Sequence, residues 1–281
     1  MHALSPGTVL EHNIRHYTTL YSSLDEELLV SRATDPGFFH RAIRTHTSWF
    51  GLYRDNFAAR IAGATVLELG FGDGLNALIM ARLGARVTAV EIAEPAVRSL
   101  QGTASRLGYD VHALHGDFLS MSNLPRFDFI VGKAFLHHLD HATEREFLRR
   151  TASLLTPDGE ARFQEPAVNS QALDTLRWIV PVPGRPSILN RPAFREWKQR
   201  DPHPDRDQSS NHYQRAGLEF FESVKVVPFG ALERFRRLIR QRSWSERYAY
   251  WALSAEPRLL PGALSATLAR SHTIILAQPR S

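Results

Sequence analysis

Between residues 62 and 166, short apolar runs alternate with longer stretches in which apolar residues recur at helical spacing. The first run, residues 66–69, lies between Gly63 and Gly70, which is typical of a parallel strand buried on both faces. From Leu75 the apolar residues recur three or four positions apart, and Gly84 ends this expected helix. The same pattern predicts further strands at 86–90, 111–114, 127–131 and 160–164. This repeat indicates an α/β fold with a mostly parallel sheet.

Helical patterns also precede the first strand. They extend over residues 8–30 and 36–61, with a break at Asp35-Pro36-Gly37. The second stretch carries more aromatic residues than one helix face needs. We expect residues 1–61 to form an N-terminal helical lid.

The strand–helix repeat breaks between residues 167 and 210. This segment is too rich in proline for one long helix and too rich in aromatic residues for a disordered linker. Short helices over 173–180 and 192–200 are expected to form a cap over a substrate pocket. The repeat resumes with strands at 223–228 and 271–277 and helices at 232–242 and 245–255. We therefore divide the chain into the lid, a core over 62–166, the cap over 167–210 and a C-terminal part of the core over 211–281.

The turn after the first strand carries three glycines in the pattern Glu68-x-Gly70-x-Gly72-x-Gly74. A glycine turn that opens a helix lets a ligand approach the backbone amides closely. The dinucleotide fingerprint needs a further glycine at the position that Leu75 occupies, so the spacing disfavours a nicotinamide cofactor. A structural turn without a ligand is the other alternative for this segment taken alone.

This pattern resembles motif I of the class I S-adenosylmethionine (SAM)-dependent methyltransferases of the small-molecule, natural-product type. The resemblance covers about residues 60–165 and implies a Rossmann-like sheet of seven strands, mostly parallel, with an antiparallel last strand. It also implies S-adenosyl-L-methionine as the cofactor and S-adenosyl-L-homocysteine as the product. Glu68 would then face the cationic methionine end of the cofactor. The turn around the cofactor would consist of Gly70, Phe71, Gly72 and Gly74.

The residues that follow the next two strands are similar to the rest of the family's cofactor signature. By this resemblance, Glu91 accepts hydrogen bonds from both ribose hydroxyls, and Ile92 packs on the adenine face. Asp117 would accept a hydrogen bond from the exocyclic amine, with Phe118 alongside the ring. Signals at the ends of successive strands therefore support the same cofactor.

The segment after the fourth strand, residues 132–139, is similar to the "HHL" segment of the family. The resemblance places Lys133 at the cofactor. His137 and His138 lie near the same rim of the sheet, and a neutral imidazole can accept the proton of a hydroxyl at physiological pH. Because a helix turns by about 100° per residue, only one of the pair is expected to face the pocket, and similar enzymes favour His138.

Two further roles have more than one interpretation. In similar enzymes the N-terminal helices close over the cofactor, so Tyr17 or Tyr21 would donate a hydrogen bond to the methionine carboxylate. The alternative is that these tyrosines pack the helix onto the core. Glu165 ends the fifth strand at the same rim as the glycine turn, where it would act as a general base, a substrate anchor or a solvated charge.

Basic and aromatic residues gather in and after the expected cap. Trp178, Arg185, Trp197 and His212 are expected to contact the substrate. A basic cluster would hold a carboxylate or phosphate of an anionic small molecule. Its members are Arg185, Arg191, Arg195, His203, Arg206, His212 and Arg215. A second basic group is interpreted as the solvated face of one helix. It comprises Arg234, Arg236, Arg237, Arg240 and Arg242.

Composition narrows the class of protein. At 281 residues and 43% hydrophobic content, the chain can bury a full α/β core. It contains no cysteine, which excludes disulfides, thiolate metal sites and cysteine nucleophiles, and we expect no metal ion. No apolar run approaches the length of a transmembrane helix, and residues 1–5 lack the charged and apolar regions of a leader. We expect a cytoplasmic enzyme that binds neither a membrane nor nucleic acid, since no nucleic-acid motif accompanies its charge.

Together these observations predict a methyltransferase that modifies a small molecule, of the natural-product type, at oxygen or activated carbon. The segment after the fourth strand lacks the Asn/Asp-Pro-Pro-Tyr/Phe sequence of the amino methyltransferases of nucleic acids and glutamine. One alternative is methylation of a prenyl-diphosphate-like acceptor at carbon, in which aromatic residues stabilise a carbocation and Glu165 removes its proton. The alternative from another class is a SAM-binding regulatory protein without an acceptor site.

Overall fold

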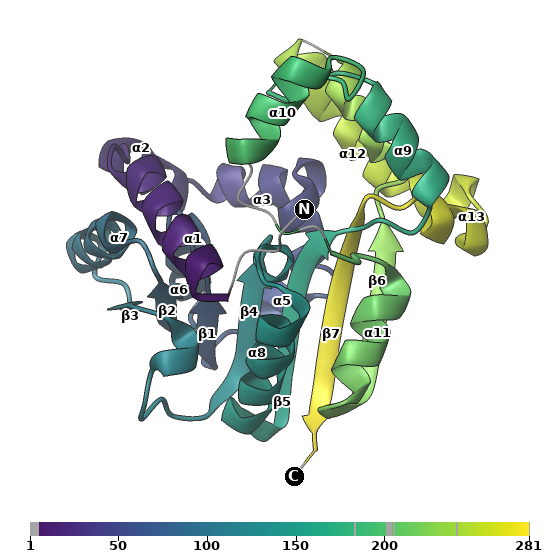
Figure 1. The fold of residues 1–281 in the computed structure, drawn as a ribbon. Coiled ribbons are helices and arrows are strands. Elements are labelled where there is room, and N and C mark those ends of the chain that lie inside the picture. The colour runs from purple at the N-terminus through teal and green to yellow at the C-terminus, as the bar shows by residue number, and fades with distance from the viewer. Residues whose placement is uncertain (1–5, 183, 201–203, 205, 240, 281) are drawn as a thin grey trace.

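One sheet forms the centre of the molecule (Figure 1). Its strands are β1 (Thr65–Leu69), β2 (Arg86–Glu91), β3 (Val111–His115), β4 (Phe127–Lys133), β5 (Leu155–Pro166), β6 (Phe221–Phe229) and β7 (Ser271–Pro279). They are arranged in the order β3-β2-β1-β4-β5-β7-β6. Neighbouring strands from β3 to β5 are parallel, whereas β7 runs antiparallel to both β5 and β6. This topology confirms the predicted seven-stranded, mostly parallel sheet with an antiparallel last strand.

The computed structural model describes residues 6–182, 184–200, 204, 206–239 and 241–280. Residues 1–5, which bear on the expected absence of a leader, lie outside these ranges, as do His203 and Arg240 of the two basic groups. Within the described ranges, every helix is too short or too polar to span a bilayer.

Helices cover both faces of the sheet. The covering helices include α6 (Leu75–Arg82), α7 (Glu94–Leu107), α8 (His141–Leu154) and α11 (Ser210–Leu218). Alternate residues of a strand point to opposite faces, so Val66 of β1 packs into a core with α6 and α7. Its neighbour Leu67 packs into a second core with α8 and α11. Burial on both faces explains why the strands are short continuous apolar runs in the sequence.

The helices that precede β1 have two different positions. They are α1 (Pro6–Tyr21), α2 (Glu26–Thr34), α3 (Pro36–Thr45), α4 (Thr47–Leu52) and α5 (Phe57–Arg60). The carboxylate of Asp25 accepts a hydrogen bond from the amide of Leu28 at 2.9 Å and so starts α2 after a break. Buried residues of α2 to α5, such as Phe39 and Trp49, belong to the core beside β1. Only α1 therefore has the position expected of a lid, and residues 26–61 are part of the core.

The segments after β5 extend beyond the carboxyl ends of β4 and β5. They include α9 (Gln171–Ile179), α10 (Arg191–Arg200), the 3₁₀ helix η3 (Glu233–Leu238), α12 (Arg242–Leu259) and α13 (Gly262–Leu268). In Figure 1, α9, α10 and α12 form an arch above the sheet. The short helices expected over 173–180 and 192–200 are thus joined by α12, which comes from the long connection between β6 and β7.

The expected helix over 232–242 differs from the structure. Residues 233–238 form η3, and a separate α-helix starts only at Arg242. Side-chain bonds fix this tighter geometry, since Arg236 donates to the Thr45 carbonyl oxygen at 2.8 Å and to the Ser245 hydroxyl at 2.9 Å. Arg234 and Arg236 are half-buried, whereas Arg242 is exposed and starts the separate helix α12, so these three do not form the solvated face of one helix. The side chain of Arg237, like Arg240, lies outside the described part of the chain.

Candidate active site

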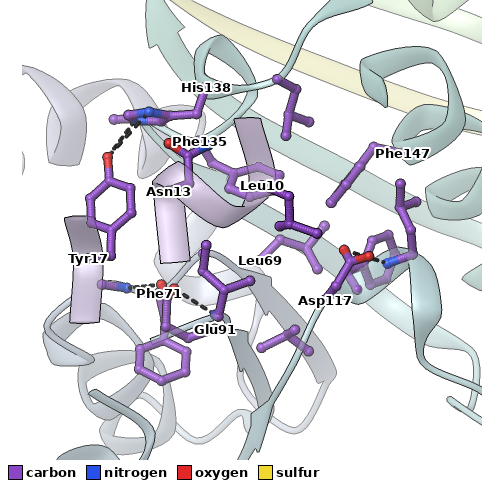
Figure 2. Close-up of a pocket in the computed structure, with 18 of the residues that line it drawn as sticks. Leu10, Asn13, Tyr17, Leu69, Phe71, Glu91, Asp117, Phe135, His138 and Phe147 are labelled. Carbon is purple, nitrogen blue, oxygen red and sulfur yellow. Dashed lines mark hydrogen bonds between the residues drawn. The ribbon is translucent and has the colours of Figure 1, made fainter. Parts of the chain in front are cut away.

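A cavity of about 590 Å³ lies at the carboxyl ends of β1, β2 and β4, under α1 (Figure 2). We call it the rim cavity. Its size is that of an ordinary small-molecule site, and ligands of α/β sheets bind where the strand order reverses, here between β1 and β4. Its wall consists of residues 69–73, 90–92, 116–119, 133–135, 138–140, 143 and 147, together with Leu10, Asn13, Tyr17 and Tyr21 of α1.

The glycine turn forms the floor of the rim cavity. Gly70 and Gly72 have φ angles of +63° and +65°, which side chains rarely adopt. A Cβ atom on Gly72 would lie 2.9 Å from the Tyr21 hydroxyl oxygen, and one on Gly70 would overlap the ring of Phe135. Glycine is therefore required at both positions. Gly74 does not line the cavity, because it caps the start of α6 instead.

Glu91 holds the turn and faces the same cavity (Figure 2). Its carboxylate accepts hydrogen bonds from the amides of Gly72 at 3.1 Å, Ile92 at 2.7 Å and Ala93 at 3.2 Å. The residue is only 6% exposed, and burial raises the pKa of its carboxyl. Ile92 lines the cavity as well. A carboxylate has about four acceptor positions, so Glu91 retains capacity to accept from a ligand hydroxyl.

The loop after β3 contributes an acidic and an aromatic residue. Asp117 accepts from the amide of Leu119 at 3.1 Å and from the Ser120 hydroxyl at 3.0 Å, and it caps the 3₁₀ helix η1 (Phe118–Ser120). Asp117 and the buried ring of Phe118 both line the rim cavity. These bonds fix the Asp117 carboxylate at the cavity wall.

Glu68 lies behind the turn and does not line the cavity. It is 1% exposed, and one of its oxygens accepts a hydrogen bond from the side-chain amide of Asn76 at 2.7 Å. Among the described residues its other oxygen has no partner. Burial raises the pKa of Glu68 to about 7, although the ammonium of Lys133, which does line the cavity, acts against this shift. The expectation that Glu68 faces a bound ligand directly is thus not met by this structure.

Helix α1 closes the rim cavity from above. The Tyr17 hydroxyl lies 3.2 Å from Nε2 and 3.3 Å from Nδ1 of His138. Tyr17 and Tyr21 stack with ring centroids 5.9 Å apart, and burial raises the pKa of Tyr21. Asn13, which the sequence analysis missed, lines the cavity and is 7% exposed, and its side-chain oxygen has no partner among the described residues.

Of the three catalytic candidates, only His138 lines the rim cavity. Glu165 is fully buried and accepts from the amides of Phe135 at 2.9 Å, Leu136 at 2.7 Å and His137 at 3.2 Å. It also binds Nδ1 of His137 at 2.7 Å. Both Glu165 and His137 therefore hold the loop after β4. The structure corrects the expectation that Glu165 is an acceptor-facing base, because protein groups use both of its oxygens.

A second cavity of about 680 Å³ lies beneath α9 and beside η3, and we call it the cap cavity. The two cavities are adjacent, since Ala134 lines both. Ala134 has a φ angle of +55°, a strained value for a residue with a side chain, and its amide donates to the Gln164 carbonyl oxygen at 2.7 Å. The polar lining of the cap cavity includes His46, Gln164, Asn169, Arg177, Arg185, Arg234, Arg236 and Arg270.

One of the four expected substrate residues, Arg185, lines the cap cavity. Trp178 lies behind it, with the guanidinium carbon of Arg185 4.8 Å from a Trp178 ring centroid. Trp197 packs against Trp178 at 5.8 Å between centroids, and neither indole lines a described cavity. These two tryptophans support the cap, so the structure corrects their expected contact with a substrate.

His212 belongs to a separate buried network. Its Nε2 lies 2.6 Å from a carboxylate oxygen of Glu144, and the same oxygen pairs with Arg206 at 2.7 Å. Arg206 also donates to the carbonyl oxygens of Leu136 and Leu139 at 2.8 and 2.7 Å. Together with Glu144 and His141, His212 has the donor atoms of a metal site, but the cationic Arg206 bound to Glu144 opposes a second cation. His212 and Arg206 therefore fix the loop after β4 and do not contact either cavity.

The cap-cavity residues that the sequence analysis missed carry no local motif. Gln164 precedes Glu165 on β5, and His46 lies between α3 and α4. The arginines come from α9, η3 and the residue before β7. Only the tertiary fold brings these elements together, so a sequence pattern could not have identified them.

Comparison with known proteins assigns residues 66–159 to a family described as methyltransferase domain. A cypemycin N-terminal methyltransferase from a Streptomyces species is 36% identical over 101 residues, which are 35% of this chain and 40% of that protein. A ubiquinone biosynthesis O-methyltransferase of Xanthomonas oryzae pv. oryzae is 36% identical over 110 residues, 38% of this chain and 45% of the relative. This chain thus spans less than half the length of these two relatives.

Solved structures extend the similarity beyond the matched domain. A putative methyltransferase from Bacillus halodurans C-125 aligns with a TM-score of 0.50 at 15% identity, over 82% of this chain and 99% of that chain. At this level of identity the likeness concerns the fold alone. It agrees with the order and direction of the strands described above.

Proposed function

We propose that this chain, which belongs to the class I methyltransferases, is a SAM-dependent enzyme that methylates a small molecule at oxygen or activated carbon. One observation carries the proposal: loops after three neighbouring strands bring the glycine turn, Glu91 and Asp117 to the wall of one cavity. The names of the two relatives, which refer to cypemycin and to ubiquinone biosynthesis, support a small-molecule acceptor of the natural-product type. Methylation at oxygen is supported by the ubiquinone relative alone, because the name of the cypemycin relative refers to an N-terminus.

The residues of the rim cavity fit SAM. The glycine turn leaves backbone exposed where a side chain would collide with Tyr21 or Phe135. Glu91 would accept from the ribose hydroxyls, and Asp117 would accept from the adenine amine. The unpartnered side-chain oxygen of Asn13 would accept from the ammonium group, and Lys133 would pair with the carboxylate. When bound, SAM supplies an electrophilic methyl group on a sulfonium.

The chain's own part in the reaction is to position an acceptor and remove its proton. His138 lines the rim cavity, and the Tyr17 hydroxyl holds its imidazole from α1 (Figure 2). A neutral imidazole in this position would accept the proton of an acceptor hydroxyl. The acceptor would enter from the cap cavity, because Ala134 lines both cavities. Helix α1 would exclude water from the opposite side.

The same geometry weakens the two alternative functions. Methylation of a prenyl-diphosphate-like acceptor requires Glu165 as a base, and Glu165 is buried with both oxygens bonded. A regulatory protein that only binds SAM needs no acceptor site, whereas here a second cavity adjoins the first. We therefore favour an enzyme with His138 as the base.

Titration calorimetry tests the cofactor assignment. Wild-type protein should bind SAM and S-adenosylhomocysteine. Glu91→Gln should lower the affinity for both ligands roughly ten-fold to a hundred-fold, because it loses the charge-assisted hydrogen bonds to the ribose hydroxyls. Glu91→Gln also replaces one of the two oxygens that accept backbone amides of the turn, so thermal unfolding must show that the variant still folds before its affinities are compared. Glu94→Gln is the matched control, because Glu94 is exposed at the start of α7, where it pairs with Arg98. Binding of NADH in place of SAM would contradict the proposal.

A further inference from the structure

The cap cavity has an excess of positive charge. Its wall contains five arginines and one acidic residue, Asp174, which lies 3.5 Å from Arg177. Behind the wall, buried Glu233 pairs with Arg270 at 2.8 Å and lies 3.9 Å from Arg236. Buried Glu256 also acts on Arg234, so five arginines against these three carboxylates leave a net charge of +2 at the wall. Arg185 and Arg234 have no carboxylate partner among the described residues.

Arg185 and Arg234 also have donors without acceptors. Arg185 is 8% exposed, and its Nε and one of its terminal nitrogens are buried without a hydrogen-bond partner in the described part of the chain. The other terminal nitrogen donates to the carbonyl oxygens of Arg177 and Val180. Arg234 donates to the Ala269 carbonyl oxygen at 3.2 Å, while its buried Nε has no partner within the described ranges. Unpaired donors on buried cations are costly, and an anion would satisfy them.

Carboxylates compensate the positive field at these two arginines only in part, because Glu256 raises the pKa of Arg234 and Asp174 raises that of Arg185 against larger opposing effects. Burial lowers the pKa of Arg234, and the neighbouring charges of Arg270 and Arg177 lower it further. Burial and then Arg177 have the same effect on the pKa of Arg185. An anion in the cap cavity would offset the repulsion between the arginines and stabilise their charged forms.

One part of the wall is apolar. Leucine, valine and phenylalanine side chains of α9, the following turn and η3 line the cap cavity. They are Leu173, Leu176, Val180, Val182, Phe235 and Leu238. Leu176, Phe235 and Leu238 are exposed, which is unusual for residues of this size and favours an apolar ligand body beside them.

We propose that the cap cavity binds an amphiphilic acid as the methyl acceptor, with its carboxylate or phosphate held by Arg185 and Arg234 and its apolar body held by α9 and η3. The proposal rests on the proposed methyltransferase function, since it identifies the class of acceptor. Gln164 lines the cap cavity near Ala134, and its buried side-chain oxygen has no partner among the described residues. The Gln164 oxygen would accept from the polar group of the acceptor that extends toward the rim cavity.

The test is a titration of cofactor-free protein with octanoate, octyl phosphate and 1-octanol. Octanoate or octyl phosphate should bind more tightly than 1-octanol, and the tighter-binding anion of the two identifies the acidic group.

Arg234→Gln should weaken the affinity for the anion roughly ten-fold to a hundred-fold, as expected for the loss of a charge-assisted hydrogen bond, and leave the affinity for octanol unchanged. High salt should weaken anion binding alone, because it screens charges and not apolar contacts. Arg185→Gln should have the same selective effect, and thermal unfolding of each variant will verify that it folds.

Arg98→Gln is the control, because Arg98 is an exposed residue of α7 outside both cavities. Each protein is also titrated with S-adenosylhomocysteine, which separates the two proposals. Equal binding of octanol and both anions, or no response to Arg234→Gln in a protein that still binds S-adenosylhomocysteine, would overturn the inference alone. A folded protein that fails to bind S-adenosylhomocysteine would instead contradict the proposed function.

Discussion

Glu165 and His138 both border the loop after β4, and burial separates their roles. Glu165 has no exposed surface and accepts from three backbone amides and from His137. His138, whose ring centroid lies 4.2 Å from that of His137, lines the rim cavity. A carboxylate that the sequence places at the rim of a sheet can therefore be a structural anchor, because its role depends on which groups the fold brings to it.

Substitution by glutamine should distinguish these roles. With an acceptor identified from a product assay on phenols, sugars and acids, His138→Gln should lower turnover by roughly 10²–10⁴-fold and leave S-adenosylhomocysteine affinity nearly unchanged. Glu165→Gln should instead lower the free energy of unfolding by about 3 kcal/mol, because an amide cannot replace a carboxylate that accepts four hydrogen bonds. The measurements are steady-state kinetics and urea unfolding.

Exposed residues of the same types serve as controls. His112 on β3 and Glu222 on β6 are both exposed. His112→Gln and Glu222→Gln should therefore change neither the turnover nor the free energy of unfolding. Loss of turnover in a Glu165→Gln protein of wild-type stability, with an active His138→Gln protein, would reverse the assignment.

Glu68 gives a prediction for pH dependence. Burial raises its pKa from an ordinary value of 4.5 to about 7, so between these values the folded chain retains a proton that the unfolded chain loses. The free energy of unfolding should therefore fall as the pH rises through this window, by up to about 3 kcal/mol. His272 acts in the opposite direction, since burial lowers its pKa to about 4 and its contribution to stability is lost as the pH falls.

Because these two effects overlap, the test compares wild type with Glu68→Gln. Glutamine does not titrate, so the stability of the variant relative to wild type should increase between about pH 4.5 and about pH 7. Urea unfolding at several pH values measures this difference. A difference that stays constant with pH would show that Glu68 is ionised in the folded chain as readily as in the unfolded one.

Single residues also show what the sequence could and could not predict. Glu91 and Asp117 were identified by their resemblance to the methyltransferase signature, and they lie at and just after the ends of β2 and β3. Such ends of parallel strands meet at one rim. Asn13 and Arg234 lack such a signal. Their positions depend on how α1 and η3 pack against distant parts of the chain, and no local pattern encodes that packing.

At the scale of elements, α1 stands apart from the helices that follow it. Residues of α2 to α5 are buried in the core, whereas α1 places Leu10, Asn13, Tyr17 and Tyr21 on the rim cavity. The helical periodicity of both stretches is similar, so the sequence predicted helices correctly and assigned them all to one lid. Which helix packs on the core and which covers a cavity depends on tertiary contacts.

This position predicts that a ligand stabilises α1. Arg15 is exposed on α1, and cleavage there by trypsin requires the helix to unfold locally. S-adenosylhomocysteine at about 100 times its Kd should slow this cleavage by up to roughly a hundred-fold, if binding requires a folded α1. Cleavage after Arg98 is the internal control, since α7 packs on the sheet away from the cavity. Equal rates at Arg15 with and without ligand would show that α1 takes no part in binding.

The connection between β6 and β7 shows the limit of prediction for elements. Apolar spacing indicated helices over 232–242 and 245–255, and helices do occupy most of this segment. The sequence did not indicate that residues 233–238 form a 3₁₀ helix or that α12 joins the cap. Hydrogen bonds from Arg236 to Thr45 and to Ser245 determine that arrangement, and they join residues far apart in the chain.

At the scale of the whole molecule, the sheet places two cavities next to each other. The rim cavity lies where the strand order reverses between β1 and β4, and the cap cavity lies at the ends of β5 and β7. Ala134 at the end of β4 lies between them. The alternating pattern of strands and helices predicted this sheet, and hence the rim that carries the cofactor residues. The cap cavity was not predictable in detail, because its wall combines five separate parts of the chain, at residues 46–48, 134, 164–185, 234–238 and 267–271.

A crystal structure of the protein grown with S-adenosylhomocysteine tests the central claim most directly. We predict that the ligand occupies the rim cavity, with its ribose hydroxyls on Glu91, its adenine beside Asp117 and Phe118, and its sulfur directed toward Ala134 and the cap cavity. A ligand bound in the cap cavity, or a rim cavity that stays empty at saturating ligand, would contradict the account.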